Sequence, residues 1–320
     1  MRVLFVGGTG PIGQATVPRL LAHGHEVAVA HSGAHEPSQS SEAEHLHGTR
    51  EELLALGGAV ERWRADVLVD TFAGGATAAK ARELGAAAAR GGTSQLIAIS
   101  SLDVYRHCAL AGVDEHEPSD IAIDPLPLRE DAARRDRPSP HGGTSRDNVA
   151  MEDALHGAAR ITILRPGAIY GPCIHERVLR EWYLVGKVAR GDRGLPLPGG
   201  GTQLFHRVAL DLVGQAIAAA TRHAPDGLWA CNVGDAQDLT FGGLAALVGR
   251  ELDWEWEPAV VGWEDGDHPW NVRHPVLVDT TRLRSVLGVG DADPMAATVA
   301  QIAWLWEHRH GVQQLVGDGG

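Results

Sequence analysis

The chain has 320 residues, of which 44% are hydrophobic, and its formal net charge is −13 at pH 7. This length and apolar content support a large buried core, whereas the acidic balance argues against a nucleic-acid or anionic-membrane partner. The three cysteines lie far apart without C-x-x-C spacing, which argues against a zinc centre or a disulfide framework. No apolar stretch reaches membrane-spanning length and no signal-peptide pattern is present, so we expect a soluble cytoplasmic protein.

The first predicted element is a strand at residues 3–6, which leads through a glycine-rich loop into a helix at residues 14–21. Glycines allow a tight turn and a close backbone approach to a pyrophosphate, while the N-terminus of the helix offers free N–H groups to the phosphates. The loop therefore predicts a dinucleotide site formed by Gly7, Thr9, Gly10, Pro11, Ile12 and Gly13.

Strands and helices alternate through the first half of the chain. The near-continuous apolar runs at residues 26–30, 66–72 and 95–100 are typical of parallel strands that are buried on both faces. Helices are predicted between them at residues 50–56 and 76–90. Later elements are a helix at 147–158, a strand at 160–165, a helix at 210–221, a strand at 229–233 and a helix at 296–308. The pattern predicts an α/β protein with a Rossmann-type, doubly wound parallel sheet.

Two polar segments interrupt this alternation. Residues 106–143 contain five prolines among many charges, so they are predicted to form a long loop that could act as a lid. The other segment carries His31, His35, His45 and His47. It is rich in Ser, Gly and Glu and has no i, i+4 ligand pair on a convincing helix, so it is interpreted as a solvated loop without a metal.

Several motifs in chain order resemble the extended short-chain dehydrogenase/reductase superfamily, in particular its NAD-dependent epimerase/dehydratase group. They are the glycine loop at 7–13, DVLVDTFAG at 66–74, ISSLDVYR at 99–106, LRPGAIYGP at 164–172, CNVGD at 231–235 and VDTTRLRSVLG at 278–288. The resemblance implies a Rossmann domain at 1–171, to which 202–235 return. It also implies a smaller, mostly helical substrate lobe at 172–201 and 236–320.

The resemblance also assigns roles to single residues. Ser101, four residues before Tyr105, takes the position that hydrogen-bonds the substrate oxygen. NAD or NADP is the implied cofactor. Its adenine-side ribose and pyrophosphate would be lined by Phe72, Ala73 and Gly74, and its nicotinamide by Pro166, Gly167, Ala168 and Ile169.

The chain departs from the family where the catalytic Tyr-x-x-x-Lys pair belongs. Anchoring the helix on Glu152 puts Thr144 at the Tyr position and Asn148 at the Lys position. A Thr hydroxyl does not ionise usefully near neutral pH, and Asn carries no charge to lower the pKa of a neighbour. The specificity position after the second strand is also altered, since His31 and Ser32 replace the usual Asp or Arg, which predicts weak discrimination between NAD and NADP.

Two residues are candidates for the missing acid/base. Asp103 takes a place where sugar-nucleotide dehydratases of this family carry a catalytic Glu, and His141 lies just ahead of the altered helix. Three functions stay open: an NAD(P)-binding epimerase/dehydratase-like enzyme, a redox-silent isomerase, lyase or cyclase, and a non-catalytic nucleotide-binding sensor. The expected partner is a small hydroxylated or carbonyl compound such as a sugar derivative, with a homodimer as one option for assembly.

Overall fold

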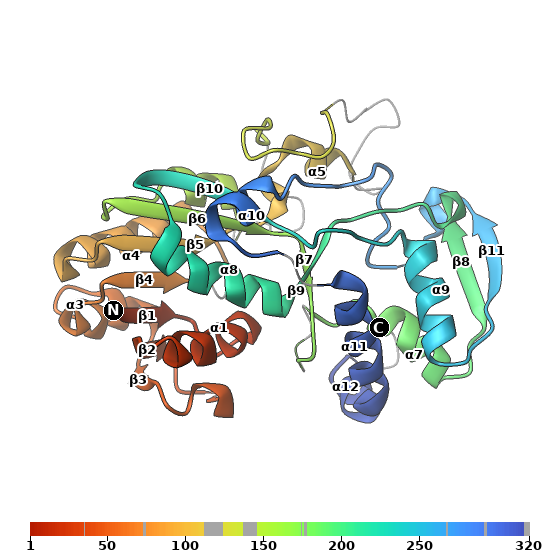
Figure 1. Cartoon of the computed structure of the whole chain (residues 1–320), viewed down its shortest axis with the longest axis horizontal. Coiled ribbons are helices and arrows are strands. Elements are labelled where there is room, and N and C mark those ends of the chain that lie inside the picture. Colours follow the sequence, from red (N-terminus) through yellow and green to blue (C-terminus); the bar gives the residue numbers. More distant parts are fainter. Residues whose placement is uncertain are drawn as a thin grey trace.

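A parallel sheet forms the centre of the molecule (Figure 1). The computed structural model describes residues 1–34, 36–72, 75–111, 124–136, 146–173, 175, 178–266, 268–290 and 293–316. Within them, seven strands follow the order β10-β6-β5-β4-β1-β2-β3, and every neighbouring pair is parallel. The strands are β1 (Arg2–Val6), β2 (Glu26–His31), β3 (Glu44–His47), β4 (Val67–Asp70), β5 (Gln95–Ile99), β6 (Arg160–Pro166) and β10 (Gly227–Val233). The predicted doubly wound sheet is confirmed.

Both faces of this sheet are covered by helices, as the alternation of side chains along β1 shows. Val3 and Phe5 pack into the apolar cluster shared with α1 (Pro11–Ala22), α8 (Leu210–His223) and α10 (Thr281–Leu287). Leu4 and Val6 pack into the opposite cluster with α2 (Arg50–Leu54), α3 (Ala59–Trp63), α4 (Ala78–Gly91) and α6 (Asn148–Asp153). Each buried Leu, Val or Phe contributes about 1.5–3 kcal/mol, which explains why these strands read as unbroken apolar runs.

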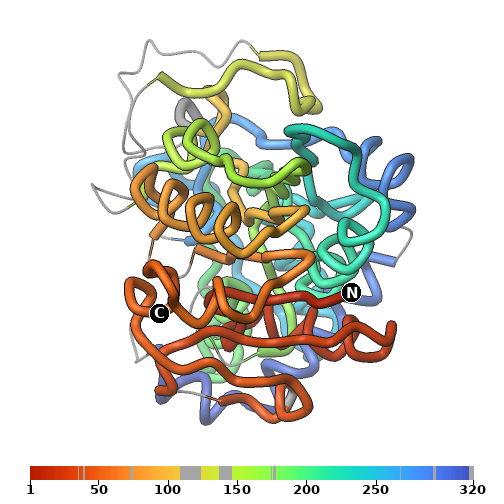
Figure 2. Tube along the Cα trace, turned by 90° about the vertical axis from the view of Figure 1, so that its left-hand side faces the viewer, coloured from red at the N-terminus to blue at the C-terminus, as the bar shows by residue number. Residues whose placement is uncertain are grey.

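A third apolar cluster lies in the other part of the molecule, on the right of Figure 1. It is built from α7 (Trp182–Ala189), α9 (Phe241–Glu251), α11 (Pro294–Glu307) and α12 (Arg309–Val316). The short parallel pair of β8 (Gly194–Pro198) and β11 (Glu257–Val261) accompanies it. A second short pair, β7 (Ala168–Tyr170) with β9 (Arg207–Ala209), packs instead into the apolar cluster of α1 and α8. When the molecule is turned by 90°, the N-terminal strands face the viewer and the part around the third cluster lies behind them (Figure 2).

The structure corrects three expectations. The segment at 106–143 begins with a helix, α5 (Arg106–Ala111), because the turn that ends β5 continues directly into it. Residues 44–47 form the edge strand β3 rather than a solvated loop, because their backbone pairs with β2. The helix predicted at 147–158 is shorter than expected. It follows the N-cap Asp147, whose side chain accepts a hydrogen bond from Ala150 N, and it ends at Asp153.

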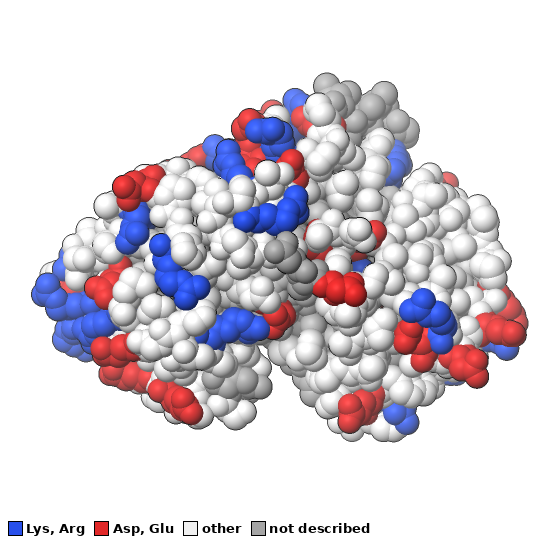
Figure 3. Space-filling model, in the orientation of Figure 1, with Lys and Arg blue, Asp and Glu red and all other residues white. Residues whose placement is uncertain are grey.

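Among the described residues, no helix has both the length and the apolar character needed to cross a membrane. Acidic and basic side chains are interspersed over the face drawn in Figure 3.

Candidate functional site

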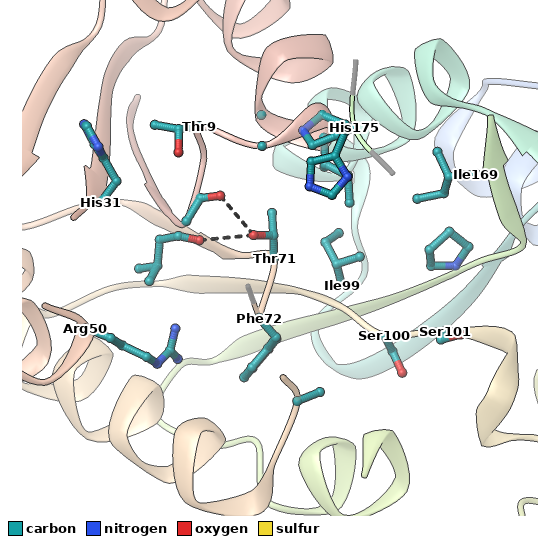
Figure 4. A pocket seen from close by; sticks show the side chains of 18 of the residues that line it. Thr9, His31, Arg50, Thr71, Phe72, Ile99, Ser100, Ser101, Ile169 and His175 are labelled. Carbon is teal, nitrogen blue, oxygen red and sulfur yellow. Dashed lines mark hydrogen bonds between the residues drawn. The ribbon is translucent and has the colours of Figure 1, made fainter. Parts of the chain in front are cut away.

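A cavity of about 540 Å³ opens at the carboxyl edge of the sheet, where five strands end in succession. Its wall includes the residues that terminate or follow β1, β2, β4, β5 and β6, among them Gly7, His31, Phe72, Ser100 and Pro166. This edge, next to the switch from β1 to β4, is where open α/β sheets bind their ligands. In Figure 4, Thr9, His31 and Arg50 lie at one end of the pocket, and Ser100, Ser101 and Ile169 lie at the other.

The glycine loop has the shape that a pyrophosphate needs. A Cβ atom on Gly13 would lie 1.7 Å from Gly8 O, so only glycine allows α1 to pack this closely on the loop. A Cβ atom on Gly10 would meet nothing within 4 Å, which leaves free space for a ligand. Gly10 is the N-cap of α1 and makes no side-chain capping bond, so first-turn N–H groups remain available for an anion.

Loop packing fixes this cradle against the neighbouring strand. Thr71 Oγ1 donates a hydrogen bond to Gly7 O at 3.1 Å, drawn dashed in Figure 4. Phe72 follows with a φ of +49°, a conformation that costs a bulky residue energy, and its N–H donates to Asp70 Oδ1 at 2.7 Å. Asp70 is fully buried and also accepts from Arg50. The buried carboxylate therefore holds both Phe72 and Arg50 at the wall.

The charge of the pocket is opposite to that of the whole chain. Three arginines line it, Arg50, Arg146 and Arg180, whereas none of the described lining residues is Asp or Glu. Arg50 is paired with Asp70, whereas Arg146 and Arg180 add positive charge to a wall without described carboxylates, which favours an anionic ligand in a protein of net charge −13. The residues present therefore fit a dinucleotide phosphate.

At the reacting end, Ser101 lines the pocket and caps a short 3₁₀ turn, accepting a hydrogen bond from Asp103 N at 3.3 Å. Asn148, predicted from the sequence to occupy the Lys position, also lines the pocket and donates through Nδ2 to Asp103 Oδ1 at 2.6 Å. Asp103 itself is not among the lining residues, and its side chain is 29% exposed. Arg135 approaches its other oxygen to 3.9 Å. The structure thus joins Ser101, Asp103 and Asn148 in one hydrogen-bonded group.

Helix α6 is fixed by a buried ion pair one turn beyond Asn148. Glu152, 2% exposed, accepts from Arg165 at 2.7 and 2.9 Å and from Ser100 Oγ at 2.6 Å. These contacts join α6 to the ends of β5 and β6, so Asn148 is directed toward the pocket.

No described tyrosine or lysine lines the pocket. Tyr105 is buried, donates to Asn232 Oδ1 at 2.5 Å and accepts from Arg165, and burial raises its pKa to about 12. Tyr170 donates to Asp235 at 2.7 Å, and burial raises its pKa further. Tyr183 packs in the lobe under Lys187. The raised pKa values of Tyr105 and Tyr170 keep these two phenols neutral at physiological pH, and within the described chain no tyrosine and lysine face the pocket together.

The pocket brings together most of the predicted cofactor residues. The described ones that line it are Gly7, Thr9, Gly10, Pro11, Ile12, Gly13, His31, Ser32, Phe72, Pro166, Gly167 and Ile169. Ala168 is buried in β7 and does not line it. Ala73, Gly74, His141 and Thr144 lie outside the described residues.

Sequence reasoning missed His175 and Arg180, which line the pocket from the segment between β7 and α7, and Arg146 just before α6. His175 and Arg180 lie outside the recognised motifs, and Arg146 lies between the two positions of the altered Tyr-x-x-x-Lys pair, so only the fold brings the three to the cavity.

Residues 7–124 match the model of an NAD(P)H-binding family. The chain carries an NAD(P)-binding domain. A search among curated proteins found no significant match. The chain resembles a UDP-glucose 4-epimerase from Thermotoga maritima solved with UDP-glucose, at 18% identity and a TM-score of 0.71 over 97% of this chain and 100% of that one. A UDP-glucose 4-epimerase from Thermus thermophilus, solved as a complex with NAD, is similar at 21% identity, with a TM-score of 0.67 over 95% of this chain and 98% of that one.

The NAD-dependent NDP-hexosamine 5,6-dehydratase TunA is similar at 19% identity, with a TM-score of 0.70 over 96% of this chain and 98% of that one. These similarities show that this NAD(P)-binding protein has the fold of the epimerase/dehydratase group, as the motifs predicted. They cover 95–97% of this chain rather than residues 7–124 alone.

Proposed function

We propose that the protein is an NAD(P)-dependent enzyme of the epimerase/dehydratase type that acts on an anionic sugar derivative. The observation that carries this proposal is the convergence of the glycine cradle, Ser101 and Pro166–Gly167 in one cavity lined by arginines. The neighbours solved with UDP-glucose support a nucleotide-linked sugar as the substrate class. When bound, NAD(P) supplies a hydride acceptor and donor at its nicotinamide.

The protein's own residues divide the remaining work. Ser101 Oγ would hydrogen-bond the reacting oxygen of the substrate and hold it in place. Asp103 would take up the proton released there, its carboxylate held by Asn148 Nδ2, 2.6 Å from Oδ1, and by Arg135, 3.9 Å from Oδ2. Arg146 and Arg180 would hold the anionic part of the substrate.

The experiment that tests this function begins with the small molecules retained by the purified protein. Mass spectrometry of the denatured sample should identify NAD or NADP, and incubation with a panel of nucleotide sugars should yield an epimer or a dehydrated product. A protein that binds the dinucleotide but converts none of the panel would refute the sugar-nucleotide assignment.

A redox-silent enzyme is the second candidate, and the lack of a tyrosine or lysine among the described lining residues favours it. The two candidates differ in whether a substrate C–H bond breaks as a hydride. Substrate deuterated at the carbinol carbon should turn over more slowly in the first case and at an unchanged rate in the second.

A further inference from the structure

The edge of the sheet beside the cofactor pocket gathers three imidazoles and a carboxylate. His31, Glu36, His45 and His47 each offer one ligand atom, and these four atoms lie within 4.8 Å of one another. We call these four residues the histidine cluster. From this geometry we propose that the cluster is a binding site for a divalent transition metal ion of the Zn²⁺ class.

Strand pairing explains why these residues meet. In the parallel register, His31 of β2 lies opposite His47 of β3, and Val29 lies opposite His45. Because side chains alternate along a strand, His45 and His47 share one face with His31. Glu36 reaches the same point from the loop between the two strands. The pairing of β2 with β3 and the position of Glu36 between them thus bring the four ligands together without distorting either strand.

The distances suit one ion rather than a stack of rings. Nε2 of His31 lies 2.7 Å from Nδ1 of His45, and Nε2 of His47 lies 2.6 Å from Glu36 Oε1. The remaining separations from Glu36 Oε1 are 3.9 Å to His31 and 4.0 Å to His45. Ligands at the usual zinc distance of about 2.0–2.1 Å stand roughly 3.3 Å apart around a tetrahedron, within this range. The His31 ring is nearly perpendicular to both others, at 83° and 86°.

The outer contacts of His45 prepare it to bind a cation. Its Nε2 lies 3.0 Å from Ser40 O, which accepts only, so Nε2 carries the proton and the Nδ1 lone pair points into the cluster. Gly33 N–H donates to Nδ1 of His31 at 3.1 Å, so without metal the Nε2 proton of His31 lies toward His45. On binding, this proton moves to Nδ1 of His31, the Gly33 bond breaks, and Nε2 becomes a ligand.

The four ligands differ in burial, so the proposed ion would be partly enclosed and still accessible from solvent. The side chains of His31 and His45 are 4% and 15% exposed, whereas Glu36 and His47 are 48% and 53% exposed. The ion would enter from solvent past the latter two and rest against the former two. Imidazole and carboxylate ligands suit Zn²⁺ and its first-row neighbours, whereas Mg²⁺ and Ca²⁺ prefer oxygen ligands.

His31 also lines the cofactor pocket, so the proposed ion lies directly outside the wall of that pocket. An ion here would fasten residues 32–43 to the edge strand. Its role would therefore be to stabilise the rim of the site, and its detection does not depend on catalytic activity.

The test uses the whole chain without an affinity tag, stripped of metal and dialysed against Zn²⁺. We expect one tightly held equivalent per chain by elemental analysis, a thermal midpoint that rises with Zn²⁺, and visible absorption of four-coordinate Co²⁺ after cobalt loading. Glu36→Gln and His47→Ala, both at half-exposed positions, should fold normally and each weaken binding by at least about tenfold.

His223→Ala, on an exposed residue at the end of α8, is the matched control for the many other histidines and should bind as the wild type does. The proposal is overturned if the wild type retains no zinc, if the two cluster variants bind zinc as the wild type does, or if His223→Ala loses it equally.

Discussion

Ser101 is the predicted catalytic residue whose described side chain lies directly at the cavity. If it hydrogen-bonds the reacting oxygen, Ser101→Ala removes a contact that is strongest in the transition state. We expect kcat to fall by roughly 10²–10³, which corresponds to ~2.7–4 kcal/mol, with little change in NAD(P) affinity. Steady-state kinetics on the identified substrate, with calorimetry for the cofactor, measure both. Ser285→Ala, on the exposed side of α10, is the control, and equal turnover of the Ser101 variant would remove Ser101 from the mechanism.

Asn148 and Asp103 are expected to act as one unit, because a 2.6 Å hydrogen bond joins them. Asn148→Ala should lower kcat more than it changes KM, since a freely rotating carboxylate is rarely in position. Asp103→Asn should lower kcat as well, and the double variant should be little worse than Asp103→Asn. The double-mutant cycle should give a coupling of about 0.5–3 kcal/mol. Strict additivity of the two losses would show that Asn148 does not position Asp103.

At the scale of elements, a substitution in the glycine loop before α1 should abolish cofactor binding without affecting folding. Gly10→Val places its side chain in free space at φ −78°, so the chain should fold while the pyrophosphate is excluded. Calorimetry should detect no binding of NAD or NADP, with an unchanged thermal midpoint. Gly311→Val, also in free space but on α12, is the matched control and should bind as the wild type does. Undiminished binding by the Gly10 variant would place the pyrophosphate elsewhere.

Helix α6 depends on the Glu152–Arg165 pair, whose side chains are 2% and 5% exposed. Removing either partner leaves a buried charge alone, so Glu152→Gln or Arg165→Met should each lower the free energy of unfolding by about 3–5 kcal/mol. Denaturant titration gives this value, and the double variant should recover part of the loss. Arg193→Met, which breaks exposed pairs with Glu255 and Glu257, should cost less than about 1 kcal/mol. A loss of about 3–5 kcal/mol for Arg193→Met as well would show that burial of the ion pair does not cause the large loss at Glu152 and Arg165.

The elements that could be predicted from the sequence are those buried on two sides. Strands β1, β2, β4, β5 and β6 appear within a few residues of their predicted bounds, because burial on both faces demands an apolar run. The edge strand β10 also appears close to its predicted bounds, and its last residues, Cys231 to Val233, are buried. The other edge strand, β3, was missed because its sequence EHLH carries no apolar run. Strands β8 and β11 were missed because prolines within them suggest loops.

The candidate site divides in a similar way. Motif residues next to strand ends, such as Gly10, Ser101 and Pro166, could be placed from their position in the chain. The contacts that depend on long-range packing could not, including the approach of His175 and Arg180 to the cavity. The convergence of His31, His45 and His47 could not be predicted either, because these residues alternate along a strand pair rather than recurring along a helix.

At the scale of the whole molecule, the central sheet is not made from one continuous stretch of chain. The edge strand β10 pairs with β6, although residues 167–226 separate the two strands in the sequence. Until β10 is added, β6 is an apolar edge strand with unpaired N–H and C=O groups along RITILRP. Such an edge invites pairing with other chains.

A chain that ends at residue 226 should therefore aggregate when expressed, although it contains six of the seven strands. Size-exclusion chromatography of this truncation, beside a chain that ends at residue 316, measures the effect. A soluble monomer with cooperative unfolding would show that β6 tolerates a free edge.

The same arrangement has a consequence for synthesis on the ribosome. Six strands leave the exit tunnel long before β10, and during that interval the nascent chain carries an uncovered sheet edge while the intervening segment of residues 167–226 is being made. Because β10 is made late, we expect chaperones that shield exposed strands to bind this chain during translation. Slow codons placed after residue 166 would lengthen that exposure, whereas fast ones would shorten it.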